Sequence, residues 1–479
     1  MKLNLSTIKA TKPYTILADN RDKAIGILFI IFASITSIVF SFMLPFGQSP
    51  DEMSHYQMME SEFGTTGFVD EVDIKVWHGG GYGNLPFNYA AKVDYDAAAA
   101  AAEIHFETPL TITSFHPSPF IVRHFPMGLG FYLGAALGLP IIVCTHMAEL
   151  FATAFFIIVG YLAIRITPIK KDIFAFCMLM PETIHQCSSV SYDAVIIPCS
   201  FFLFAYILHL YYREKKVGWK DMIIVGVFTL VIAITKVPYA AIVLALLIIP
   251  VSHYDLRIGK KDGKNIEVAS LVRKFWYLVA ILVILAGCAA IYLGRHSAEI
   301  KTLVSDILEL PEFLKFLQRT YEQRIYAHLQ QMVGMFGWAD SFVTGQYVIL
   351  FFGVMVYLNT CITEKVDKKL NIPRRLLMLA IVVIALLMVE VAMQSWNYVV
   401  YGWDTTASLD TFRTYIAGSD WNLGVQGRYF IPVLPVILVA LSGITQRKRT
   451  VGYYLIQFAF YAASAYSVFN ILNARYWIV

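Results

Sequence analysis

Residues 24–44 read AIGILFIIFASITSIVFSFML, an apolar stretch without a charged side chain. A helix needs about twenty such residues to cross the hydrocarbon core of a bilayer. A basic tail precedes the stretch, with Lys2, Lys9, Lys12, Arg21 and Lys23. A secretory signal would have a shorter apolar core followed by small residues at a cleavage site. The sequence therefore predicts a retained first transmembrane helix over 24–46.

The composition of the whole chain is that of a membrane protein. It has 479 residues, of which 58% are hydrophobic and 15% are charged, whereas soluble domains have about 25% charged residues. The net charge of +4 follows the membrane topology given below, so no nucleic-acid partner is expected. The six cysteines lie in or beside apolar stretches and predict neither a disulfide framework nor a CxxC metal motif.

The apolar stretches predict an all-α polytopic integral membrane protein with about 11 transmembrane helices (range about 10–13). The stretches of spanning quality are residues 24–46, 142–166, 173–188, 193–212, 222–236, 238–252, 275–294, 345–361, 375–395, 429–445 and 451–472. A further apolar stretch, 124–140, is either re-entrant or spanning.

The lysine and arginine residues decide the orientation. They are concentrated in short segments that lie inside if the amino terminus is cytoplasmic, as the positive-inside rule requires. The large loops then all lie outside, where we expect the chemistry. The predicted organisation is a cytoplasmic basic tail (1–23), the first transmembrane helix (24–46), a first large outer loop with the acidic motif and a potential re-entrant helix (47–141), central transmembrane helices (142–294), a second outer loop (295–344), transmembrane helices (345–395), a third outer loop (396–428) and carboxyl-terminal transmembrane helices (429–479).

An acidic cluster follows the first apolar stretch, in Pro50-Asp51-Glu52-Met53-Ser54-His55. A carboxylate here can take a proton from an acceptor hydroxyl or hold a divalent cation, Mg²⁺ or Mn²⁺. Adjacent side chains diverge, so Asp51 and Glu52 are not expected to share one role, whereas helical spacing places Asp51 and His55 on one face. The alternative is a solvated helix end, since acidic residues favour a first helical turn. One Asp-Glu pair is not a metal signature, so we expect no metal, with Asp51 and Glu52 as its ligands if one binds.

Further polar residues lie at the same predicted face. His116 stands beside a proline and Arg123 precedes the stretch that returns to the membrane, while Ser191 and Asp193 occupy the tip between the third and fourth spans. Each is a candidate for substrate binding, and each has a structural alternative as part of a polar turn. A Ser-His-Asp hydrolase is not supported, because the chain has no GxSxG elbow.

Two cations complete the predicted site. Lys236 interrupts an apolar hairpin, where ionisable groups are costly and usually functional, and Pro238 breaks the helix so that Lys236 lies near the outer boundary. Arg428 opens the tenth span, and its planar guanidinium suits a phosphate. A snorkelling lysine and an interfacial arginine are the alternatives. Trp338 could likewise be an aromatic-belt residue.

The order and spacing of these motifs resemble a family of bacterial polytopic membrane proteins of unknown function that belongs to the GT-C glycosyltransferase superfamily. The motifs are Pro50-Asp51-Glu52 with His55, His116-Pro117, Met180-Pro181, Ser189-Val190-Ser191-Tyr192-Asp193, Lys236-Val237-Pro238-Tyr239, Gly337-Trp338-Ala339-Asp340 and Gln426-Gly427-Arg428-Tyr429-Phe430-Ile431-Pro432. Together they extend over nearly the whole chain.

The resemblance implies a GT-C-type enzyme at the outer face of the bacterial plasma membrane. It would transfer a sugar from a polyprenyl-phosphate donor to a cell-surface glycan. In the superfamily an acidic residue of the first outer loop is the general base or metal ligand, and Asp51 and Glu52 occupy that place. Lys236 and Arg428 match the basic residues that hold the phosphate. The motifs add four substrate-binding candidates, Tyr239, Asp340, Gln426 and Tyr429.

Three other functions remain open from the sequence. A transporter or flippase for lipid-linked glycans would have polar groups at the membrane midplane and often an internal repeat, and we see no repeat. A ligase that joins whole glycans is close to the main interpretation. A non-catalytic scaffold for envelope assembly would tolerate replacement of Asp51 and Lys236.

Overall fold

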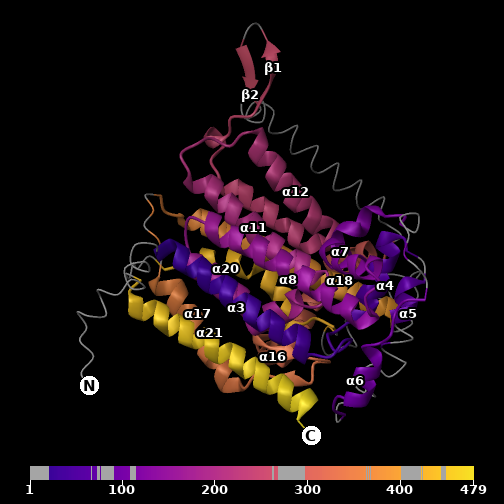
Figure 1. Cartoon of the computed structure of the whole chain (residues 1–479). Helices are drawn as coiled ribbons and strands as arrows, with labels where there is room; N and C mark the ends of the chain where they lie inside the picture. Colours follow the sequence, from indigo (N-terminus) through magenta and orange to yellow (C-terminus); the bar gives the residue numbers. More distant parts are fainter. Residues whose placement is uncertain are drawn as a thin grey trace, which may run out of the picture.

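The computed structural model describes residues 21–65, 67–72, 76, 91–107, 110, 115–261, 264–267, 297–362, 364, 366, 368–400, 422, 424–443 and 449–478. The fold is almost entirely helical, as predicted (Figure 1). The predicted span 275–294, most of the basic tail and most of the third outer loop lie outside the described residues.

The first half of the chain forms helices in this order: α3 (Arg21–Met43), α4 (Glu52–Phe63), α5 (Phe68–Val72), α6 (Tyr95–Ala101), the 3-10 helix η3 (Pro119–Arg123), α7 (Phe125–Ala136), α8 (Ile141–Ile166), α9 (Lys171–Met178), α10 (Pro181–Cys187), α11 (Asp193–Tyr212), α12 (Trp219–Thr235) and the 3-10 helices η4 (Val237–Ile248) and η5 (Val251–His253).

The second half contains two small antiparallel hairpins among its helices. Its elements are β1 (Arg257–Lys261), β2 (Lys264–Glu267), α15 (Ala298–Leu308), α16 (Leu310–Val333), β3 (Met335–Phe336), β4 (Ser341–Phe342), α17 (Gly345–Cys361), α18 (Ile372–Val400), the 3-10 helix η6 (Gly427–Val433), α20 (Leu434–Ala440), α21 (Val451–Leu472) and the π-helix η7 (Asn473–Trp477). The hairpin of β1 and β2 projects from the helices at the top of Figure 1.

Five described helices are long and apolar enough to cross a membrane. They are Lys23–Met43, Ile141–Ile166, Asp193–Tyr212, Ile372–Trp396 and Val451–Trp477. Shorter apolar helices occupy other predicted stretches, among them α7, η4 and α17. The chain is therefore a helical protein with several apolar helices, and the count of eleven spans stays a prediction.

Helix α11 forms the centre of the bundle, because its side chains are apolar on all sides. Of its most apolar window, 94% is buried inside the protein, as expected of a helix without a polar face. Helix α8 packs against α11, and α3 packs against α8 and α21. Helices α3, α8 and α11 run alongside one another through the middle of Figure 1, and α21 runs along its lower edge beside α3.

Prolines mark a change of backbone conformation within or at the start of three of the predicted spans. The stretch 173–188 forms two short helices, α9 and α10, because the residue before Pro181 favours an extended backbone. The stretch 238–252 is a 3-10 helix that begins directly after Lys236, with Pro238 in its first turn. The stretch 429–445 changes from the 3-10 helix η6, which contains Pro432, to α20. The boundary between α12 and η4 falls at Lys236, a predicted site residue.

Candidate active site

The short loop between α3 and α4 is held by three hydrogen bonds that involve side chains. The Glu52 carboxylate accepts a hydrogen bond of 2.9 Å from the backbone N–H of Gly47, and Trp338 donates its indole N–H to the carbonyl of Gly47 at 3.1 Å. The Ser49 hydroxyl lies 3.3 Å from Nε2 of His185. The loop is thereby fixed in one conformation before Asp51 is reached.

Asp51 has a left-handed backbone conformation, with φ 63° and ψ 8° at the residue before α4. Residues other than glycine adopt this conformation at a cost, and they persist where the surrounding structure enforces it. The side chain of Asp51 is 58% exposed, and its Oδ2 lies 3.1 Å from a terminal nitrogen of Arg428. The loop thus presents one accessible carboxylate in a fixed position.

Arg428 is the buried partner that orients Asp51. Its side chain is only 6% exposed, and one terminal nitrogen donates to Oε1 of Gln186 at 2.8 Å. Its Nε lies 3.8 Å from Oδ2 of Asp193. One guanidinium therefore connects the start of α4 with α10, α11 and η6. In this structure it contacts two carboxylates, so a phosphate would have to share it with Asp51.

Lys236 lies at the end of α12 within a group of aromatic rings. Its Nζ lies 3.7 Å from the centre of the Tyr429 ring and 5.8 Å from the centres of the Tyr192 and Tyr239 rings. Tyr239 donates its hydroxyl proton to the carbonyl of Tyr429 at 2.9 Å. Among the described residues, no carboxylate lies within ion-pair distance of Lys236. Its charge is thus available for an anion.

An apolar pocket of about 680 Å³ begins at Lys236. Residues 236–238, α15, the start of α16 and α18 form its walls, with aliphatic side chains such as Leu303 and Met388. Two acidic residues line it: Glu299, which is exposed, and Asp306, which has 2% of its surface exposed. Burial raises the pKa of Asp306 to about 7. The pocket can take an apolar chain whose charged end lies at Lys236.

Three further side chains form a chain of hydrogen bonds beside the tyrosines. Nδ1 of His55 lies 3.0 Å from Nε2 of His124, and Nδ1 of His124 lies 2.7 Å from Oε2 of Glu62. The His55 ring meets the Tyr192 ring edge-on, with 4.5 Å between their centres. Arg123 lies at the rim, 3.9 Å from Oε1 of Glu62.

Other predicted site residues have structural contacts. The His116 backbone N–H donates to the carbonyl of Phe63 at 3.0 Å, and its side chain is exposed. The Ser191 hydroxyl accepts from the backbone N–H of Asp193 at 3.2 Å. Asp340 pairs with Arg475 at 2.6 Å.

The carbonyl of Gln426 accepts a hydrogen bond of 3.0 Å from the backbone N–H of Tyr429. The structure brings about half of the predicted site residues together: Asp51, His55, Asp193, Lys236, Tyr239, Arg428 and Tyr429, with Arg123 at the rim beside Glu62. Backbone hydrogen bonds are made by Glu52, His116, Ser191, Trp338 and Gln426, whereas Asp340 forms an ion pair with Arg475.

Asp51 and Glu52 have different environments, as the sequence suggested. Glu52 is buried and accepts backbone N–H groups, including that of Val190 at 3.3 Å. Within the described ranges, no group of three or more His, Cys, Asp or Glu side chains could hold a metal ion. The two carboxylates do not converge on one point.

Burial and the charge of Glu149 raise the pKa of Glu52 to about 8, although its backbone hydrogen bonds act in the opposite direction. Below its ordinary value of 4.5, the carboxyl is protonated in the folded and unfolded chain alike. Between that pH and about 8 only the unfolded chain releases the proton, so rising pH favours unfolding.

We therefore expect the thermal unfolding midpoint in detergent to fall as the pH rises from about 5 to about 8. Glu52→Gln, which stays neutral, should flatten this dependence. Glu103→Gln, at an exposed position of the same outer loop, should leave it unchanged. Equal slopes for wild type and Glu52→Gln would contradict the assignment.

Several residues of the site were not predicted from the sequence. Glu62 lies seven residues after His55 on α4, and this helical spacing could have indicated a shared face. His124 directly follows Arg123 in the sequence, and nothing else in the sequence indicated that it belongs to the site. Gln186 gave no signal, because its role depends on contact with Arg428, 242 residues away.

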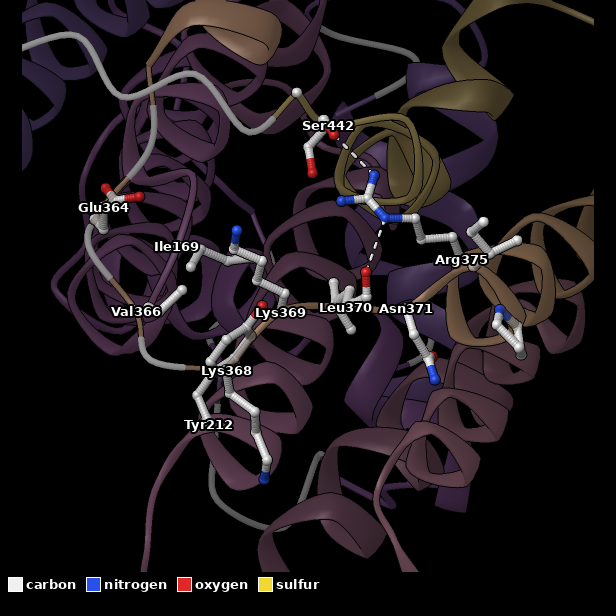
Figure 2. A pocket seen from close by; sticks show the side chains of 13 residues that line it. Ile169, Tyr212, Glu364, Val366, Lys368, Lys369, Leu370, Asn371, Arg375 and Ser442 are labelled. Carbon is white, nitrogen blue, oxygen red and sulfur yellow. Dashed lines mark hydrogen bonds between the residues drawn. The ribbon is translucent and has the colours of Figure 1, made fainter.

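A second pocket, of about 660 Å³, lies among segments that the sequence predicts to face the inner side (Figure 2). Lys368, Lys369 and Arg375 line it. The guanidinium of Arg375 donates to the carbonyls of Leu370, Ala440 and Ser442, at 2.8–3.1 Å. This arginine therefore caps backbone ends, and we place the candidate site at Asp51 instead.

A family model described as a predicted membrane protein, DUF2142, matches residues 35–437. The chain belongs to the DUF2142 family. The DUF2142 region contains the acidic loop, Lys236 and Arg428, so every residue of the candidate site falls within it. Comparison with curated proteins and with solved structures found no match.

Proposed function

We propose that the protein is a GT-C-type glycosyltransferase that takes a sugar from a polyprenyl-phosphate donor at the outer face of a bacterial plasma membrane. The acceptor would be a cell-surface glycan. The observation that carries the proposal is the pairing of Lys236 with the apolar pocket that begins at it. A lipid phosphate needs both an apolar channel and an unpaired cation, and Asp51 supplies a carboxylate nearby.

The site would divide the reaction between its charged groups. Asp51 takes the proton of the acceptor hydroxyl as the new glycosidic bond forms. Lys236, with Arg428 behind it, stabilises the phosphate that departs as an anion. A single displacement of this kind inverts the configuration at the anomeric carbon. The proposal includes eleven spans with a cytoplasmic amino terminus, because that topology places these groups outside.

The test uses purified protein in lipid with synthetic polyprenyl-phosphate sugars and envelope glycan, and it follows the release of polyprenyl phosphate. Asp51→Asn should lower kcat by about 10²–10⁴-fold, the usual contribution of a general base. Lys236→Met should raise KM and lower kcat. Asp70→Asn, at an exposed position of the same outer loop, should retain wild-type turnover.

Three outcomes would count against the proposal. Turnover by Asp51→Asn at the wild-type rate would remove Asp51 as the base. If no donor supports turnover and Asp51→Asn still complements a deletion strain, a transporter, flippase or scaffold replaces the transferase. Release of a whole glycan instead of one sugar would favour a ligase.

A further inference from the structure

The chain of hydrogen bonds from His55 through His124 to Glu62 is buried along its length. The three residues are 4%, 0% and 5% exposed. His55 and Glu62 lie two helical turns apart on α4, and His124 lies before α7 and joins them. Each of these buried polar groups carries a desolvation cost, which apolar side chains of similar size would avoid. The two imidazoles and the carboxylate therefore do more than fill space.

The Glu62 carboxylate determines which nitrogen of each histidine donates and which accepts along the row of hydrogen bonds. An ionised Glu62 can only accept, so Nδ1 of His124 carries a proton. In the neutral imidazole the other nitrogen then accepts, so Nδ1 of His55 donates to it. The remaining nitrogen, Nε2 of His55, is left with a free lone pair. Within the described part of the chain, no hydrogen bond to this Nε2 is present.

The electrostatic environments of His55 and His124 determine which of the two rings can carry a positive charge. Burial, His124, Arg428 and Lys236 all lower the pKa of His55 well below its ordinary range. A proton that arrives at Nε2 of His55 is therefore not held as a charge on that ring. His124 differs because it contacts the Glu62 carboxylate, with which an imidazolium forms an ion pair.

We propose that His55, His124 and Glu62 form a proton relay that removes the proton taken up at Asp51 and stores it at His124. The proposal rests on the proposed transferase function. The backbone N–H of His55 donates to the carbonyl of Asp51 at 3.0 Å, and both residues lie near Arg428. The proposal takes one water molecule to connect the Asp51 carboxylate with Nε2 of His55.

The relay step is balanced at every bond. The O–H bond on Asp51 breaks as an N–H bond forms at Nε2 of His55. The Nδ1–H bond of His55 breaks as an N–H bond forms at Nε2 of His124. His55 ends neutral as its other tautomer, and His124 ends as an imidazolium beside Glu62. Asp51 regains its negative charge and its ion pair with Arg428.

The charged and titratable neighbours of His55 and Glu62 favour proton transfer from His55 to His124. Lys236 and Arg428 face His55 from α12 and η6 and repel a positive charge there. Tyr192, from the segment before α11, contacts His55 through its ring edge. Arg123 contacts the Oε1 side of Glu62 and leaves Oε2 to His124.

The experiment follows the ring nitrogens of the full-length protein by NMR, with ¹⁵N-labelled histidine in lipid. His55→Gln and His124→Gln assign the signals. At neutral pH the wild type should carry the proton of each imidazole on Nδ1. On acidification His124 should gain a second proton in the same step in which the His55 proton moves from Nδ1 to Nε2. In Glu62→Gln this step should require at least tenfold more acid, whereas Glu103→Gln should match the wild type.

The relay is overturned if His55 becomes a cation itself, if its tautomer stays fixed while His124 gains a proton, or if Glu62→Gln leaves the titration unchanged. In the turnover assay, Glu62→Gln should shift the acid limb of the pH–kcat profile with little change in KM, an effect that loss of packing alone would not produce. A coupled tautomer change without turnover by any donor would retain the relay's proton chemistry and reject the transferase.

Discussion

Replacing Arg428 with methionine should remove most of the folded protein and all of its activity. The guanidinium is the buried partner of Asp193, which is itself 5% exposed, and it also holds Asp51 and Gln186. Removing one side of a buried charge pair typically costs about 3–5 kcal/mol, because the other charge stays buried without a partner. We expect a large fall in the thermal unfolding midpoint and in the monodisperse yield.

Two companion variants separate charge from geometry. Arg428→Lys keeps the charge but cannot bind an amide and a carboxylate through one planar fork, so it should restore little activity. Asp193→Asn in the Arg428→Met background removes the orphaned charge and should recover part of the stability. An unchanged unfolding midpoint in Arg428→Met would show that the arginine is not an organising residue.

Gly427→Ala should be almost as damaging, although it adds a single methyl group. A Cβ at this position would lie 2.1 Å from the carbonyl oxygen of His328 and 2.5 Å from the backbone nitrogen of Met332. Both atoms belong to the backbone of α16 and cannot rotate away. The substitution must therefore push η6 from α16 and displace the neighbouring Arg428.

We expect Gly427→Ala to give a low monodisperse yield and no polyprenyl phosphate release. Gly226→Ala is the matched control, since a Cβ at that helical position meets no atom within 4 Å. The control should match wild type in yield and unfolding midpoint. Wild-type behaviour of Gly427→Ala would mean that α16 and η6 do not pack as closely as in this structure.

The sequence predicted the bounds of the helices best where a long apolar stretch forms a single helix, and Pro198 does not interrupt α11. The stretch 193–212 coincides with α11, and 345–361 coincides with α17. The helices were predicted least well at Pro181 and Pro432. The hydrophobicity of these stretches does not indicate that the backbone changes direction or helix type there. Hydrophobicity reports that a segment is buried, whereas proline and the local packing decide how the backbone runs.

The site was predictable as a set of residues and not as a set of contacts. The predicted topology placed Asp51, Lys236 and Arg428 on the same face of the membrane. It could not predict the ion pair between Asp51 and Arg428, which are 377 positions apart in the sequence. The position of His124 depends on how closely α7 approaches α4. Gly128 permits that approach, since a Cβ there would lie 2.2 Å from the Phe63 ring. Such contacts are set by tertiary packing, which residue types alone do not specify.

Helices α12 and η4, which form the hairpin at Lys236, differ in their number of residues but have nearly the same length. The 17 residues of α12 rise about 25 Å at ~1.5 Å each, and the 12 residues of η4 rise about 24 Å at ~2.0 Å each. The far ends therefore meet at one level, where the Val217 N–H bonds to the carbonyl of His253 at 2.9 Å. A span count based on residue number undervalues such a stretched helix: its 12 residues rise about 24 Å, whereas an α-helix needs about 20 residues to cross a core of about 30 Å.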